Sequence, residues 1–174
     1  MTLTSILPSL RRSIPDPIAT DRWPEWTHPT TTDVVVSGVS LLRLVDLCDT
    51  PCVHIAAAVV PGTHGRPSDS EQASVIVARV VEIREAGIAI LDADLSHITA
   101  HTAEARLIGR ASTWHSLPFA LASESVPGAA GAAGAAGAAS VGAVLPADLR
   151  AGDLVAIPCR GAVCRRQLRS GRSS

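Results

Sequence analysis

The 174-residue sequence predicts a mainly β fold: a small β-barrel or sandwich with one short helix near its N-terminus. Short stretches of alternating or β-branched apolar residues recur along the chain, and turns with glycine or proline separate them. Helical patterns do not alternate with these stretches, which excludes Rossmann and TIM-barrel folds. Hydrophobic residues make up 47% and charged residues 18%, so the composition also excludes wholesale disorder.

The chain divides into three parts by composition. Residues 1–32 are rich in proline, threonine and serine and predict an irregular arm, which Trp23 and Trp26 are expected to anchor on a neighbouring surface. A single β-domain is predicted over residues 33–164. The arginine-rich residues 165–174 predict a basic, frayed tail.

The first half of the β-domain predicts two strands and the helix. Residues 33–37 are β-branched and predict a short strand. Apolar residues recur at nearly helical spacing over 39–47, and Thr50-Pro51 is typical of a helix end. Residues 52–60 predict the second strand, and the glycine- and proline-containing stretch 61–73 predicts a loop.

The second half predicts a hairpin and three further strands. Alternation over 74–83 and 88–95, with a glycine-containing turn between them, predicts an antiparallel pair. Further strands are expected at residues 105–112, 117–123 and 154–158. The repeat GAAGAAGAAG lies within 127–143; it places glycine at every third position, which opposes a helix, and it lacks the proline of collagen. We expect a flexible insert there.

Charge and composition limit the classes of partner and cofactor that the chain is expected to bind. The net charge of −1 gives no electrostatic case for nucleic acid or for a membrane surface. No apolar run reaches about 18 residues, and the first residues lack the long apolar core of a signal peptide, so we expect a cytoplasmic protein. All fifteen basic residues are arginine, which leaves no lysine for a Schiff base.

Several polar groups are candidates for chemistry, and each has a structural explanation. The cysteines fall into two pairs, Cys48/Cys52 near His54 and Cys159/Cys164, but we expect core-filling thiols and no metal site. Asp92 and Asp94, followed by His97 and His101, are compatible with cation binding or acid–base work, although turn and capping chemistry is the commoner use. Ser112, Thr113 and His115 lack the surrounding G-x-S-x-G of a nucleophile elbow.

Two segments, 105–123 (ARLIGRASTWHSLPFALAS) and 145–164 (LPADLRAGDLVAIPCRGAVC), together resemble part of a known enzyme family. They resemble the C-terminal β-domain of the fold-type III pyridoxal-phosphate decarboxylases that act on ornithine, diaminopimelate or arginine, and diaminopimelate decarboxylase most of all. That family carries G-x-x-C-E-S-x-D, then L-P-x-L-x-x-G-D-x-x-x-x-x-x-x-G-A-Y. The first motif is matched by Gly109, and the second by Leu145, Pro146, Gly152, Asp153, Gly161 and Ala162.

The resemblance covers residues 33–56 and 74–164, and it implies the family's role, decarboxylation of meso-diaminopimelate to lysine. Family members hold pyridoxal phosphate in a TIM barrel, where this chain has only the short stretch 57–73. They are typically head-to-tail homodimers whose active sites combine one subunit's barrel with the other's β-domain. We therefore expect no cofactor on this chain alone.

The family's functional positions are altered in this chain. Ser112 stands where the family has its active-site cysteine, Thr113 where it has a substrate-binding acid, and Ser116 where it has an aspartate. Val163, beside Gly161, stands where a tyrosine contacts the cofactor. A valine cannot replace a phenol, and a threonine cannot pair with an ammonium as a carboxylate does. We therefore assign no catalytic or cofactor-binding residue.

Two functional interpretations follow from the sequence. In the first, the chain is a barrel-less, non-catalytic relative of diaminopimelate decarboxylase, either a gene remnant or a β-domain that docks on an intact decarboxylase or associates with itself. In the alternative, it is an unrelated small β-barrel that acts as a binding or scaffold module. The first interpretation requires residues 105–123 and 145–164 to form neighbouring strands.

Overall fold

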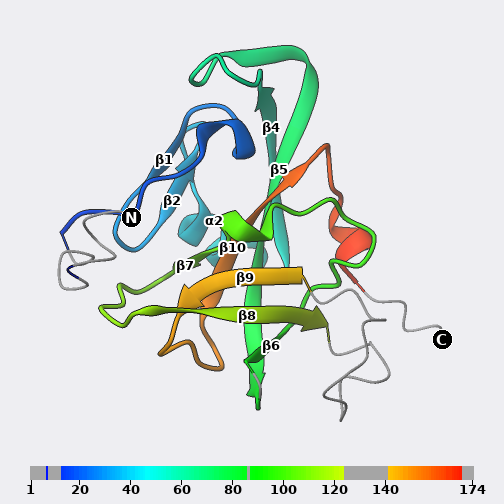
Figure 1. The fold of residues 1–174 in the computed structure, drawn as a ribbon. Coiled ribbons are helices and arrows are strands. Elements are labelled where there is room, and N and C mark those ends of the chain that lie inside the picture. The colour runs from blue at the N-terminus through cyan, green and yellow to red at the C-terminus, as the bar shows by residue number, and fades with distance from the viewer. Residues whose placement is uncertain (1–6, 8–12, 86, 124–140, 170–174) are drawn as a thin grey trace.

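The computed structural model describes residues 7, 13–85, 87–123 and 141–169, and it confirms a mainly β fold. Three short strands form one sheet in the order β1-β2-β3, and seven form a nearly closed, barrel-like sheet. The larger sheet has the order β7-β10-β5-β6-β8-β9, and β4 also pairs with β5 (Figure 1). In the described ranges, no helix has the length and apolar character needed to cross a membrane.

The elements follow one another closely along the chain. The strands are β1 (Thr27–Pro29), β2 (Val34–Val36), β3 (Val39–Ser40), β4 (Cys52–Val59), β5 (Pro67–Arg84), β6 (Ile88–Leu91), β7 (Arg106–Ile108), β8 (Ser116–Ser123), β9 (Val141–Pro146) and β10 (Leu154–Arg160). The helix α2 spans Leu41–Cys48, and the 3-10 turns are η2 (Thr20–Arg22), η3 (Thr102–Glu104) and η4 (Arg165–Leu168).

The predicted helix is confirmed as α2, and its start is fixed by side chains. The Ser40 hydroxyl accepts a hydrogen bond from the Arg43 N–H at 3.1 Å, as an N-cap does, and it donates its own proton to the Asp33 carboxylate. Leu41 points into the core. Asp49, with a φ of 56°, ends the helix just before Pro51.

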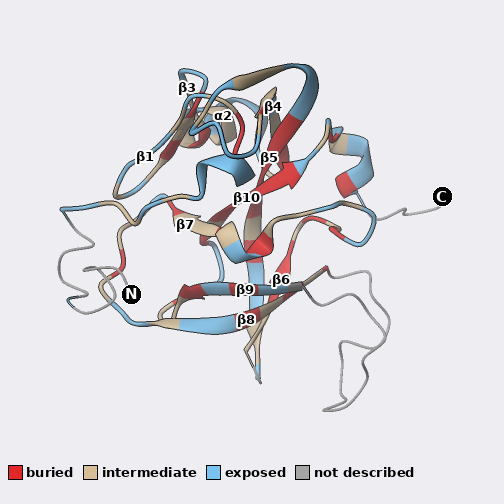
Figure 2. Ribbon diagram, turned by 45° about the horizontal axis from the view of Figure 1, so that its top comes forward, coloured by how far each residue is buried: buried red, intermediate tan, exposed pale blue. Residues whose placement is uncertain are grey.

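The hairpin that joins β4 and β5 corrects the predicted loop over 61–73. Residues from Pro67 onward belong to β5: Gln72 pairs with Ala57, and Pro67 pairs with Val59 beyond a register shift. Their polar side chains are exposed, since this end of the ribbon projects from the body of the domain (Figure 2). Backbone pairing therefore overrides a composition that is typical of a loop.

Other strand boundaries also differ from those predicted. The β5–β6 hairpin is confirmed, but β6 ends at Leu91 and not at residue 95. Just beyond this end, the Asp92 carboxylate accepts a hydrogen bond from the Arg79 N–H at 2.8 Å, in place of a backbone carbonyl. β7 is shorter than 105–112 because Gly109 turns the chain with a φ of 89°. β9 was not predicted: residues 141–143 of the expected insert pair with β8, while 127–140 lie outside the described residues.

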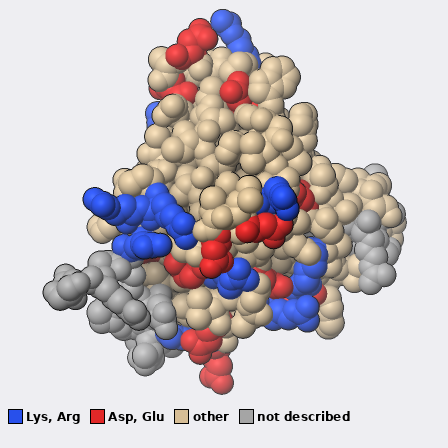
Figure 3. Space-filling model, turned by 180° about the vertical axis from the view of Figure 1, so that it is seen from behind, with Lys and Arg blue, Asp and Glu red and all other residues tan. Residues whose placement is uncertain are grey.

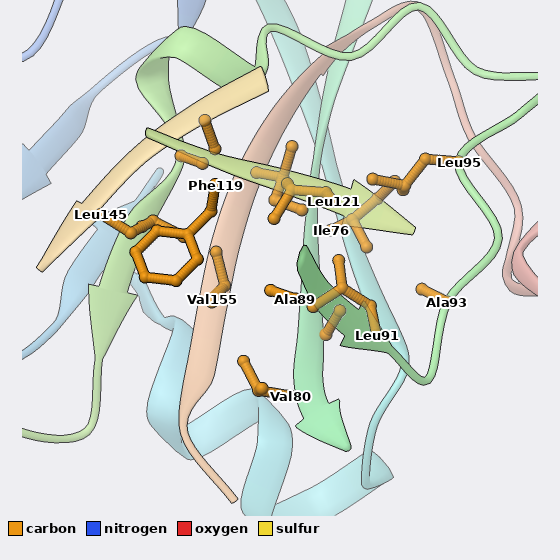
Figure 4. Packing of buried hydrophobic residues seen from close by; sticks show 14 of the residues in the cluster. Ile76, Val80, Ala89, Leu91, Ala93, Leu95, Phe119, Leu121, Leu145 and Val155 are labelled. Carbon is orange, nitrogen blue, oxygen red and sulfur yellow. The ribbon is translucent and has the colours of Figure 1, made fainter. Parts of the chain in front are cut away.

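Two hydrophobic clusters lie on the two faces of β5. Ile76 and Ala78 pack into the larger cluster, together with β6, β8, β9 and β10 (Figure 4). Val75 and Val77 face the second cluster, which contains Trp23, Val34, Val36, Leu41, Cys52, Ile108 and Ala156. Alternation along one strand thus supplies a wall to each core.

Both ends of the described chain are tied to the domain more closely than expected. Trp23 is 1% exposed, and its indole N–H donates to the Glu104 carboxylate at 3.1 Å. Trp26 is 63% exposed, so the expectation that it anchors the arm is wrong. At the other end Leu168 is buried in the larger cluster, whereas a frayed tail was expected there.

Truncation of Trp23 tests the role of the arm. We expect Trp23→Ala to lower the free energy of unfolding by about 3–5 kcal/mol, because it empties a buried position. Urea unfolding followed by far-UV circular dichroism measures this. Trp26→Asn is the control, since Asn tolerates the positive φ at that position, and it is expected to change stability by less than about 0.5 kcal/mol. Equal effects of the two substitutions would contradict the packing described.

Candidate functional site

The large sheet remains open between its terminal strands, β7 and β9. A hollow of about 640 Å³ occupies this gap. One wall is formed by residues 103–107 and the other by residues 144–146, and arm residues 15–17 and 30–31 contribute to its rim. Arg110, Ser112, His115 and Ser116 also line the hollow, which makes it the candidate site.

A side-chain network centred on Arg110 lies at this hollow. The Arg110 guanidinium donates to both carboxylate oxygens of Asp153, at 2.8 and 2.7 Å. It also donates to the Asp148 carboxylate at 2.7 Å and to the Asp148 carbonyl at 2.8 Å. The Ser112 hydroxyl donates to the other Asp148 carboxylate oxygen at 2.6 Å, and it accepts the Trp114 N–H at 3.2 Å. The two parallel hydrogen bonds from Arg110 to Asp153 have the bidentate geometry that makes arginine–carboxylate pairs strong.

The network shifts the pKa of Arg110 and the pKa of Asp148 in the directions that favour their charged forms. The hydrogen bonds to Asp153, followed by those to Asp148, outweigh burial and raise the pKa of Arg110. For Asp148, burial is the largest single influence and would raise its pKa, but the Ser112 hydrogen bond and Arg110 together lower it. Both groups are therefore held ionised at neutral pH.

The structure brings together some of the family-equivalent positions and separates others. Ser112 and Ser116 line the hollow, and Thr113 lies half-buried between them in the chain. Gly161 and Val163 lie beyond the opposite end of β10, where the Ser74 hydroxyl donates to the Gly161 carbonyl at 2.6 Å and accepts the Val163 N–H at 2.9 Å.

Sequence reasoning missed Arg110 and Asp148. Asp153 had been noted as part of a motif, and Asp148 lies five residues before it in the same segment. The partners of Arg110 are 38 and 43 residues away along the chain. No local pattern signals such a contact.

The acidic pair and histidines after β6 do not form a site. The Asp92 carboxylate accepts the Arg79 N–H, and the Asp94 carboxylate accepts the Ser96 N–H at 2.9 Å. His101 instead contacts the Arg22 guanidinium, with 3.2 Å between nitrogen atoms. The contacts of Asp92 and Asp94 are the turn and capping contacts that the pattern more often indicates.

The cysteines are distributed between the two cores and the surface. Burial raises the pKa of Cys52, in the second cluster, to about 11, and that of Cys159, in the larger cluster, to about 12. Cys48 and Cys164 are exposed. No group of three or more His, Cys, Asp or Glu side chains suited to a metal ion occurs within the ranges the structure describes.

By its fold, the protein belongs to the small, mainly β domains whose sheet is almost closed into a barrel. No family model, curated protein or solved structure matches the chain. Seen from behind, acidic and basic side chains mix across the lower half and again at the top, and neither sign dominates this face (Figure 3). What the hollow can do chemically must therefore be argued from the residues that line it.

Removal of the central arginine tests the network. We expect Arg110→Ala to lower the free energy of unfolding by about 1–3 kcal/mol, because it leaves the buried Asp153 carboxylate without its main partner. Arg150→Ala is the matched control. Arg150 is 73% exposed and lies 3.9 Å from the same carboxylate, so its loss should cost less than about 1 kcal/mol. Urea unfolding measures the free energy of unfolding of both variants. A larger decrease for Arg150→Ala than for Arg110→Ala would contradict the central role of Arg110 in the network.

The contribution of Asp148 should depend on pH. Its pKa in the folded protein is below the ordinary 3.8, so its stabilising effect is complete above about pH 4 and is lost as pH falls through the folded pKa. We expect Asp148→Asn to destabilise the protein near neutral pH, and we expect the difference from the native protein to shrink as the pH falls below about 4. Urea midpoints across this range measure the difference. A difference independent of pH would show that the carboxylate charge is not what stabilises the network.

Proposed function

We propose that this chain is a non-catalytic binding domain, related to the C-terminal β-domain of pyridoxal-phosphate decarboxylases, which docks on an intact decarboxylase. Strand pairing supports the relationship. β7 pairs with β10 and β8 pairs with β9, so residues 105–123 and 145–164 contribute neighbouring strands, as this interpretation requires. In the family, the β-domain of one subunit completes the site of another, so an intact decarboxylase offers a surface for such a domain.

The chemistry around Ser112 favours binding over catalysis. Its hydroxyl is directed at Asp148, whose lowered pKa makes it a poor general base near neutral pH. The carboxylates of Asp148 and Asp153 are both occupied by Arg110. The chain also has no lysine to form a Schiff base with a cofactor.

The observation that carries the proposal is the exposed tryptophan supported by this network. Ser112 accepts the Trp114 N–H while it is itself bound to Asp148, so a partly buried network holds the backbone of a residue whose indole is 57% exposed. His115 lies beside it, with 6.3 Å between ring centroids. Leu117, 42% exposed, follows at the start of β8. Tryptophan is among the residues most enriched at the energetic centres of protein interfaces.

Docking can be tested with the tryptophan at its centre. The purified chain is mixed with full-length diaminopimelate decarboxylase from the same organism and followed by sedimentation velocity. We expect a complex, and we expect Trp114→Ala to weaken it at least tenfold, because tryptophan hot spots cost about 2 kcal/mol or more on truncation. Trp26→Asn, which removes a similarly exposed tryptophan just before β1 of the smaller sheet, should bind as the native chain does.

Two outcomes would contradict the proposal. One is the absence of any complex at micromolar concentrations of both proteins. The other is binding that Trp114→Ala leaves unchanged. Either result favours the alternative, a small β-barrel unrelated to the decarboxylases that binds or scaffolds something else.

A further inference from the structure

The segment before η2 lies along the rim of the hollow without joining either sheet. Pro15, Asp16 and Pro17 line the hollow, and the two prolines have no N–H to donate to a strand. Among the described residues, no strand pairs with the backbone of residues 13–17, and none of these five residues is buried. We call residues 13–17 the strap, because they cross the rim without strand pairing or a buried side chain to hold them.

Two side chains on the β7 side of the hollow hold this part of the arm. The Arg106 guanidinium donates through Nη2 to the carbonyls of Asp16 and Pro17. The Glu104 carboxylate accepts the Ala19 N–H at 3.0 Å. Arg106 therefore clasps the strap itself, whereas Glu104 fixes the chain at the base of the strap.

The base is held much more firmly than the strap. Trp23 is 1% exposed and belongs to the second cluster, and its indole N–H also donates to Glu104. Ile18 packs against the same cluster, whereas Ile14, within the strap, is 48% exposed. Segments that bury few apolar groups open locally at a small fraction of the free energy of global unfolding. The strap can therefore leave the rim while its base stays in place.

The clasp also carries an electrostatic cost. The groups that accept hydrogen bonds from Arg106 at the strap are two neutral carbonyls. Burial disfavours the charged guanidinium and lowers the pKa of Arg106, although the nearby carboxylates of Asp16 and Glu104 offset part of this effect. Opening the strap would return the guanidinium to water. Desolvation of Arg106 therefore opposes the hydrogen bonds that close the strap, and we expect the closed and open positions to lie close in free energy.

We propose that the strap is a movable lid on the hollow, which Arg106 clasps in the closed position and which swings about Ala19 to open. In the open position the rim loses residues 15–17, and the Nη2 group of Arg106, which now bonds the strap, becomes available to a molecule that enters the hollow. The proposal concerns access to the hollow. It depends neither on docking through Trp114 nor on the relationship to decarboxylases.

Nuclear magnetic resonance relaxation of the ¹⁵N-labelled full-length chain tests the movement. We expect relaxation dispersion at the amides of Ile14 and Asp16, because loop and lid opening falls on the microsecond-to-millisecond timescale. We expect none at Trp23, which lies at the fixed base. The order parameters of Ile14 and Asp16 should stay near about 0.85, since the closed position predominates on the faster timescale.

A matched pair of variants tests the clasp. Arg106→Met keeps an unbranched side chain but removes every donor, so we expect the order parameters of Ile14 and Asp16 to fall below about 0.6. The order parameter of Trp23 should not change. Arg43→Met is the control, because the Arg43 side chain is 73% exposed on α2, and it should leave the strap as it is in the native chain. If Arg106→Met fails to fold, the relaxation dispersion of the native chain still decides.

Three results would overturn the proposal. The first is a native chain without relaxation dispersion at Ile14 and Asp16, which would make the strap a fixed part of the fold. The second is an order parameter below about 0.6 at these amides in the native chain, because the strap would then not be clasped. The third is an Arg106→Met variant in which both order parameters keep their native values.

Discussion

The fold depends on a strand that is buried on both faces. Along β5, residues 73–78 are all buried; Val75 and Val77 enter one cluster, and Ile76 and Ala78 enter the other. Over the same residues β4 pairs with one edge of β5 and β10 with the other, while β6 takes over farther along. The strands at the centre of the sheet are thus paired on both edges and covered on both faces. Only the strands at the two ends of the sheet, β7 and β9, have an unpaired edge. The hollow is a consequence of this arrangement.

Side chains, not backbone pairing, organise the region around the hollow. Arg110 follows β7, Asp148 follows β9, and Asp153 precedes β10. The Arg110 guanidinium therefore joins the ends of three strands, although β9 pairs with neither β7 nor β10. An arginine fork suits this task because it presents several donors in one plane, and each bond it makes offsets the cost of burying its charge.

Local patterns in the sequence predicted the elements that need little tertiary support. The helix α2, β4 and the β5–β6 hairpin have strong periodicity or clear end signals. β1, β9 and residues 67–73 were missed because they are short, small or polar, and they become strands only through their partners. Ser112 was singled out by a motif, but its link to Arg110 through Asp148 was not, since the bonded residues are distant in sequence. Periodicity carries no information on such contacts.

The network also bears on how the surfaces beside it can bind. The ion pair between Arg110 and Asp148 ties the exit of β7 to the exit of β9, so it limits how far the gap between these strands can open. The same aspartate orients Ser112, which holds the backbone at Trp114. Ordering a loop or strand edge costs free energy when a partner binds, and a site that is already ordered avoids that cost. The network is ordered when the chain folds, so a partner that bound beside it would not bear that cost.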